Sequence, residues 1–129
     1  MSAKSDRYQR GLKRIEDVFG EVWNENFLKD ISPEMNDYTI EYLFGDVYNT
    51  EKLDARSREI SIISMLIALR ANVPLSIHMH GALNVGLNRK ELIEVIVQSS
   101  VYAGYPAAVN AVEIAREVFR ERDQKGKTN

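Results

Sequence analysis

The side chains able to carry out acid–base chemistry are concentrated in two neighbouring stretches of this sequence, around Glu59 and around two histidines. His78 and His80 are the only histidines in 129 residues, and cysteine is absent. Without cysteine there is no disulfide, thiolate metal site, iron–sulfur cluster or thiol nucleophile. Catalysis by this chain would therefore depend on His, Glu, Asp, Arg, Tyr, Ser or backbone groups.

Both histidines fall on one predicted helix, which begins at Pro74 and which Gly86 can end. Successive residues of a helix are rotated by about 100°, which places His78 on the apolar side of this one. His80 is rotated about 200° away, onto the polar side. Two histidines that chelate one metal from a regular helix need four-residue spacing, so no metal site is predicted.

An imidazole on an apolar helix face has two interpretations. His78 is either a core histidine whose ring nitrogens bond to backbone or to a carboxylate, or an acid–base group partly shielded from water. His80, on the polar side, is predicted to be a solvated or interface residue.

Glu59 stands just before the apolar run of residues 60–69. A carboxylate in the first turns of a helix complements the helix dipole, and it can also pair with an imidazole as an acid–base partner. Arg56 and Arg58 flank the same helix start. Either guanidinium could hold a substrate carboxylate by two parallel hydrogen bonds, although charged residues at a helix entrance are usually solvated.

The segment VYAGYP, residues 101–106, joins the last two predicted helices. Gly104 permits a left-handed backbone conformation or the close approach of another group to the backbone. Tyr102 and Tyr105 are large half-polar rings beside it. Such a corner either lines a pocket or forms a tight turn between helices.

These groups must be positioned by helices, because apolar residues recur at three- and four-residue steps along most of the chain. We predict an all-α, single-domain bundle of about six helices. Residues 60–69 are apolar nearly all round, which is typical of a central helix. Four helix starts carry a signal: Ser32 before Pro33, Asp54 before residues 55–70, Asn88 with Glu91, and Pro106.

Length and composition suit one soluble domain over residues 1–129, with residues 1–7 and 122–129 predicted to fray. Hydrophobic residues make up 44% and charged residues 28%, and the net charge is −2, so no basic surface for nucleic acid is predicted. The polar N-terminus lacks a secretory signal, and the longest apolar run is too short to span a bilayer. These features predict a cytoplasmic protein without membrane partners.

Residues 56–69 and 74–111, RSREISIISMLIAL and PLSIHMHGALNVGLNRKELIEVIVQSSVYAGYPAAVNA, resemble the carboxymuconolactone decarboxylase family of the alkylhydroperoxidase D-like superfamily. The likeness extends from residue 37 to about residue 119. It implies a helical subunit that assembles as a homo-oligomer, typically a hexameric ring.

In the peroxidase branch of that superfamily, a glutamate precedes a Cys-x-x-Cys pair and a histidine follows it. Glu59 and His78 match the glutamate and the histidine, whereas Ala71 and Pro74 stand at the two cysteine positions. The absence of both thiols excludes thiol peroxidase and disulfide reductase chemistry.

The decarboxylase branch acts on 4-carboxymuconolactone without metal or organic cofactor. The resemblance implies that His78 is the general acid, Glu59 its orienting or relay group and Arg58 the holder of the substrate carboxylate. His80, Tyr102 and Gly104 complete the predicted substrate-binding set. Members commonly carry arginine where this chain has His80 and serine where it has Glu59, so the substrate itself stays open.

Two hypotheses follow. The first is a cofactor-free decarboxylase of a small lactone acid with histidine-mediated proton transfer. The second is a non-catalytic oligomeric protein of the same fold that binds a small carboxylate or lactone.

Overall fold

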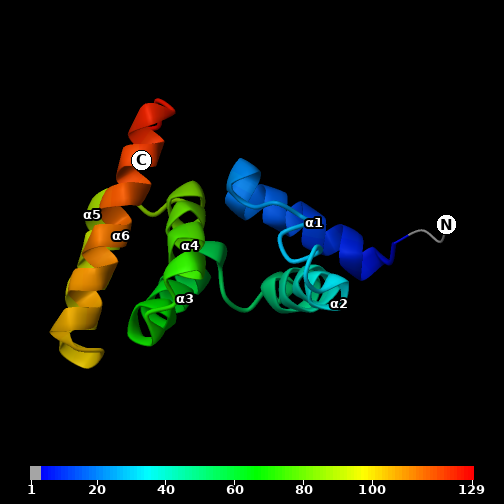
Figure 1. The fold of residues 1–129 in the computed structure, drawn as a ribbon, viewed down its shortest axis with the longest axis horizontal. Helices are drawn as coiled ribbons and strands as arrows, with labels where there is room; N and C mark the ends of the chain where they lie inside the picture. The colour runs from blue at the N-terminus through cyan, green and yellow to red at the C-terminus, as the bar shows by residue number, and fades with distance from the viewer. Residues whose placement is uncertain (1–3) are drawn as a thin grey trace. The chain divides into compact units, whose positions relative to one another are not determined.

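Every regular element in the part of the chain that the structure describes is helical. The structure is a computed structural model that describes residues 4–129 (Figure 1). Its elements are, in order, α1 (Asp6–Phe19), η1 (Gly20–Val22), α2 (Pro33–Tyr38), η2 (Thr39–Asp46), η3 (Val47–Asn49), α3 (Ala55–Leu69), α4 (Asn72–Asn84), α5 (Arg89–Tyr102) and α6 (Tyr105–Gln124). The prediction of an all-α fold with about six helices is confirmed for these residues.

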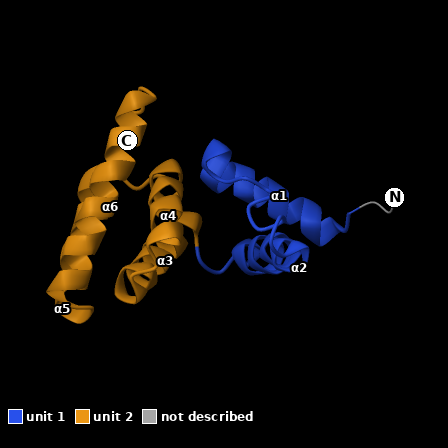
Figure 2. Cartoon of the chain, in the orientation of Figure 1, with its two compact units in different colours: residues 1–53 blue, residues 54–129 orange. Residues whose placement is uncertain are grey.

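The helices form two compact units, residues 1–53 and residues 54–129, which Figure 2 shows in different colours. The sequence predicts one domain, and the chain folds into these two compact units. The residues that carry the predicted chemistry all belong to the second unit.

In the first unit, α1 packs against η2 at very short range. Gly11 permits this approach, because a Cβ there would overlap the carbonyl oxygen of Ile40. An aromatic cluster lies beside the contact, with Phe44 edge-on to both Phe19 and Trp23 at ring-centroid distances of 5.5 and 5.6 Å. Aromatic pairs favour such tilted arrangements over face-to-face stacking.

The predicted helix from Pro33 to about residue 47 changes its winding along its length. Ser32 caps α2 by accepting a hydrogen bond from the Met35 amide at 3.2 Å, as predicted. The chain then continues as the π-helical η2 and the 3₁₀-helical η3. Asn49 donates from its side-chain amide to carbonyl oxygens of η2, which ends the segment with its acceptors satisfied.

In the second unit, the predicted caps of α3 and α5 are confirmed, whereas α4 begins earlier than predicted. Asp54 accepts a hydrogen bond from the Ser57 amide at 2.7 Å and caps α3. Asn88 and Glu91 form a reciprocal capping box on α5. α4 begins at Asn72, two residues before the predicted Pro74, which is tolerated because proline fits the first turn of a helix.

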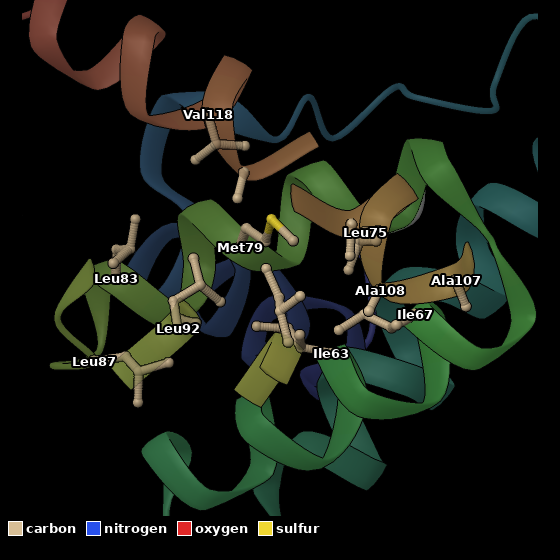
Figure 3. Packing of buried hydrophobic residues seen from close by; sticks show 14 residues of the cluster. Ile63, Ile67, Leu75, Met79, Leu83, Leu87, Leu92, Ala107, Ala108 and Val118 are labelled. Carbon is tan, nitrogen blue, oxygen red and sulfur yellow. The ribbon is translucent and has the colours of Figure 1, made fainter. Parts of the chain in front are cut away.

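The core of the second unit is apolar and lies between α3, α4, α5 and α6 (Figure 3). Ile63 and Ile67 of α3 meet Leu75 and Met79 of α4 there, all fully buried. α6 contributes small residues, so its backbone can approach closely. The members from α6 are Ala107, Ala108, Ala111, Ala115 and Val118.

The four helices of this unit alternate in direction, so their ends meet in two groups. α3 and α5 run parallel, because Arg56 pairs with Glu91 near their N-termini. The turns before α4 and α6 lie at the opposite end, where Asn110 donates to the Asn72 side chain at 2.8 Å. The loop between α5 and α6 is therefore remote from the start of α3.

Parts of both segments predicted to fray belong to helices. Residues 6 and 7 belong to α1, and residues 1–3 lie outside the described residues. Arg122 is buried in the last turn of α6, and the Asn129 side chain donates to the Leu83 carbonyl at 2.9 Å. Arg122 and Asn129 thus both contact α4. Within residues 4–129, no helix combines the length and the apolar character needed to cross a bilayer.

Candidate active site

Glu59 of α3 and His78 of α4 meet directly inside the second unit. His78 Nδ1 lies 3.0 Å from Glu59 Oε2, and the two residues are 9% and 1% exposed. Both are site residues predicted from the sequence, on neighbouring helices. Their direct contact was not predicted.

The helical spacing of the core explains why these two polar groups are buried. Glu59 precedes Ile63 and Ile67 at four-residue steps, so it continues the buried face of α3. His78 follows Leu75 of α4 by three residues, about one helical turn, and both are buried. The dipole interpretation alone does not describe Glu59, because a solvated carboxylate would be exposed. A buried carboxylate is costly unless it is paired, and His78 provides the pair.

The contact fixes the roles of the two imidazole nitrogens. An ionised carboxylate only accepts hydrogen bonds, so Nδ1 of His78 carries a proton and donates to Glu59. Nε2 lies on the side of the ring opposite to this contact. The same hydrogen bond would satisfy a structural histidine, so both interpretations of His78 include this contact.

His80 is buried, and the prediction of a solvated or interface residue is wrong. It is only 6% exposed, with Nε2 3.0 Å from Glu121 and Nδ1 3.2 Å from Arg122. The helical rotation places it away from His78 as calculated. However, α4 packs against α3 on one side and against α6 on the other, so its polar side is covered as well.

The neighbours of His80 define its protonation state. A guanidinium can only donate, so Nδ1 of His80 accepts from Arg122, and Nε2 carries the proton that is donated to Glu121. Burial lowers the pKa of His80 below its ordinary value, Arg122 and Lys125 lower it further, and Glu121 opposes them. The hydrogen bond from Arg122 and the burial of the ring both favour the neutral imidazole of His80.

Arg122 is the centre of a polar network that was not predicted from the sequence. Besides His80, it donates to the Asn84 side chain at 3.0 Å and to the Asn129 carbonyl at 2.8 Å. Burial lowers its pKa, and the nearby Arg89 adds to the effect. A signal was available, since Arg122 stands four residues after Val118 and so continues the buried stripe of α6.

The other predicted substrate-binding residues are not all brought together. Arg58 is half-buried in the first turns of α3, next to Glu59. Tyr102 and Gly104 lie at the far end of α5, about two helical turns beyond the level of Glu59. Tyr102 is 85% exposed, and Gly104 adopts a positive φ of 102° as the N-cap of α6. This corner is a tight turn between helices.

Arg56 lines a groove between α3 and α5, together with its ion-pair partner Glu91. The groove has a volume of about 350 Å³ and mostly apolar walls that include Ile60 and Val95. Ligand pockets for small molecules start near this size. In residues 4–129, no group of three or more His, Asp or Glu side chains is placed to hold a metal ion.

The fold and the site together define a class: a small helical protein, free of cysteine, with a buried imidazole–carboxylate pair. Residues 33–117 match the family described as "Carboxymuconolactone decarboxylase family". The chain belongs to this family.

Three relatives are similar to this chain over most of its length, and two of them are named as decarboxylases. The chain is 30% identical over 118 residues to a 4-carboxymuconolactone decarboxylase of Acinetobacter baylyi, covering 89% of this chain and 88% of the relative. It is 26% identical over 122 residues to a nitrosuccinic acid decarboxylase of Metarhizium robertsii, covering 92% and 85%. An uncharacterized protein of Paracoccus denitrificans is 37% identical over 89 residues, covering 67% and 66%.

Proposed function

We propose that this protein is a decarboxylase of a small carboxylic acid and that His78 donates the proton that replaces CO₂. The observation that supports the proposal most directly is the buried contact between His78 and Glu59. Two relatives named as decarboxylases add to it.

The names of the two relatives suggest the class of substrate. One acts on a lactone acid and the other on a nitro acid. Loss of CO₂ leaves an electron pair on carbon, and a carbonyl group in conjugation or a nitro group can accept that pair. We therefore propose a substrate that carries such an electron-accepting group together with its carboxylate.

The proposed chemistry needs only one acid and a positive charge. The bond between the carboxylate carbon and its neighbour breaks, CO₂ leaves, and the electron pair moves into the accepting group. His78, as the imidazolium, then transfers its Nε2 proton to the carbon and keeps the Nδ1 proton directed at Glu59. Glu59 stabilises the imidazolium and holds the ring, so it acts as a positioning residue.

For the anionic groups of such a substrate we propose two arginines of α3. Arg58 is next to Glu59 along the chain, and Arg56 lines the groove between α3 and α5. A guanidinium binds a carboxylate or a developing oxyanion through two parallel hydrogen bonds. We assign Arg58 as the residue that binds the substrate carboxylate. His80 would act indirectly, because its buried contacts hold α4 in place.

The test is turnover of 4-carboxymuconolactone and of nitrosuccinate by the purified protein, from about pH 6 to 8. We expect consumption of at least one compound, with kcat/KM lowered about 10²- to 10⁴-fold in His78→Gln. Glu59→Gln should lose activity too, because a neutral amide stabilises the imidazolium less. Ser61→Ala, at an exposed site on the same helix, is the matched control and should be unaffected.

A non-catalytic binding protein is the second candidate, because a structural histidine would make the same contact with Glu59. It predicts that one of these acids raises the melting temperature without forming product, and that His78→Gln changes affinity alone. Binding without turnover across the pH range would overturn the decarboxylase proposal and support this one.

We also propose that the protein is a homo-oligomer, with a hexamer as the expected form. Exposed apolar side chains at one end of the second unit support the proposal. They are Leu69, Val73, Val101, Tyr102 and Tyr105.

A further inference from the structure

A second groove, between α5 and α6, has a composition suited to an organic anion. Its volume is about 470 Å³, within the range of small-molecule sites. Three arginines, Arg89, Arg116 and Arg120, line it, and among the described residues Asp123 is the one carboxylate that does so.

The floor of the groove is apolar and held in place. Ile93, Val112 and Phe119 line it, and each is partly buried against the hydrophobic core. Arg89 lies over the Phe119 ring, with its guanidinium carbon 4.9 Å from the ring centroid. A planar ligand would therefore find a fixed hydrophobic surface beside positive charge.

The arginines differ in how firmly they are engaged. Arg89 is anchored, donating to Asp123 at 2.7 Å and to the Lys127 carbonyl at 3.2 Å. Its buried Nε makes no hydrogen bond within the described residues. Arg116 and Arg120 form ion pairs with glutamates one turn earlier on α6, at exposed positions.

Such exposed pairs contribute little and can exchange partners. A surface ion pair at three-residue spacing is worth a fraction of a kcal/mol. The paired glutamates, Glu113 and Glu117, are not among the lining residues. A ligand carboxylate could therefore replace them on Arg116 and Arg120, where two bidentate guanidiniums would bind it more strongly.

We propose that this groove binds an amphipathic organic anion, an aromatic or similarly planar carboxylate, at a site separate from Glu59 and His78. The ring would lie on Phe119 and its apolar neighbours, and the carboxylate would bind Arg116 and Arg120. The site involves α5 and α6, whereas the candidate active site involves α3 and α4. Its existence does not depend on decarboxylase activity.

The test is isothermal titration calorimetry of the full chain with 1-naphthoate. Two further probes separate the contributions: 1-naphthalenemethanol has the ring without the charge, and inorganic phosphate has charge without the ring. We expect 1-naphthoate to bind with one site per chain and both comparison compounds to bind at least about tenfold more weakly. No binding of 1-naphthoate, or equal binding of either comparison compound, would overturn the proposal.

A pair of double variants locates the site. Arg116→Gln with Arg120→Gln should weaken 1-naphthoate about tenfold or more. Arg70→Gln with Lys90→Gln removes the same charge from exposed positions outside the groove and should leave the affinity within about twofold. Equal losses in both would show a general charge effect and contradict the site. Circular dichroism checks that each variant is folded.

One more variant separates this proposal from the proposed function. His78→Gln should bind 1-naphthoate as the unmodified protein does, because His78 is not part of the groove. Loss of binding in His78→Gln would place the compound at the candidate active site and overturn the second-site proposal. Turnover of the decarboxylase substrates does not enter this measurement, so either proposal can fail alone.

Discussion

Two histidines only two residues apart have different surroundings and therefore different proton chemistry. His78 donates from Nδ1 to a buried carboxylate, whereas His80 accepts at Nδ1 from a buried guanidinium. A carboxylate stabilises an imidazolium, and a guanidinium opposes one. One turn of helix thus holds an acid–base candidate and a neutral structural histidine.

The neutral state of His80 predicts that stability falls in mild acid. Burial and Arg122 lower the pKa of His80 below its ordinary value of 6.5, so the unfolded chain takes up this proton more readily than the folded one. The stabilising contribution is complete above about pH 6.5 and is lost as the pH falls toward the lowered pKa. Urea unfolding between pH 7.5 and 5 should show the decline.

The variant His80→Gln isolates this effect from the titration of carboxylates. Glutamine stays neutral, so the free energy of unfolding should depend less steeply on pH between 7.5 and 5 than it does in the unmodified protein. The control is Lys90→Gln, at an exposed position. It should keep the pH dependence of the unmodified protein. Equal slopes in His80→Gln and the unmodified protein would show that His80 does not resist protonation in the fold.

At the residue scale, the sequence indicated which side chains could carry chemistry better than it indicated their surroundings in the fold. His78 was placed on an apolar helix face, and it is buried. Glu59 was left with two interpretations, a helix-dipole partner or an imidazole partner, and its burial beside His78 was not predicted. His80 was assigned to a solvated face, since periodicity on one helix does not reveal a second helix packed on its polar side. Arg122 was missed because a single charged residue at the end of a polar segment gives a weak burial signal.

At the scale of elements, capping chemistry made the helix starts predictable. Ser32, Asp54 and Asn88 each accept a hydrogen bond from a backbone amide three residues later. The winding of residues 39–49 was not predictable in the same way. π- and 3₁₀-turns share the short-range apolar pattern of an α-helix, so periodicity does not distinguish them.

The contact between α1 and η2 predicts an unusual cost for adding one methyl group. Alanine normally stabilises a helix relative to glycine by up to about 1 kcal/mol. At Gly11 the new Cβ would overlap the Ile40 carbonyl oxygen, and backbone cannot rotate away as a side chain would. Gly11→Ala should therefore lower the free energy of unfolding by about 1–3 kcal/mol, measured by urea denaturation.

The matched control is Gln9→Ala, at an exposed position on the same helix. It introduces alanine without the close contact, so its effect should lie within about 0.5 kcal/mol of zero. If Gly11→Ala were as stable as Gln9→Ala, α1 and η2 would not approach as closely as the structure shows.

At the scale of the whole molecule, the exposed apolar end of the second unit needs an explanation. α3 ends and α4 begins there, and α5 ends and α6 begins beside them, as the hydrogen bond between Asn72 and Asn110 shows. Val101 and Tyr102 are 73% and 85% exposed at this end. Contiguous exposed apolar groups commonly mark an interface, and the proposed homo-oligomer supplies a second copy to cover them.

Charge placed at this end should therefore dissociate the oligomer without unfolding the subunit. We expect the unmodified protein to show a mass near six times its chain mass of 14.8 kDa by light scattering during gel filtration. Val101→Glu with Tyr102→Glu should shift it to a smaller species with unchanged helical content, because both sites are exposed and burying a carboxylate in an interface is costly.

Tyr38→Glu with Tyr42→Glu provides the comparison, since both tyrosines are about as exposed but lie in the first unit. It should retain the original mass if assembly uses the α5–α6 end. A monomeric unmodified protein would contradict the oligomer itself. Equal dissociation in both double variants would assign the effect to general charge repulsion, because net charge alone can oppose association.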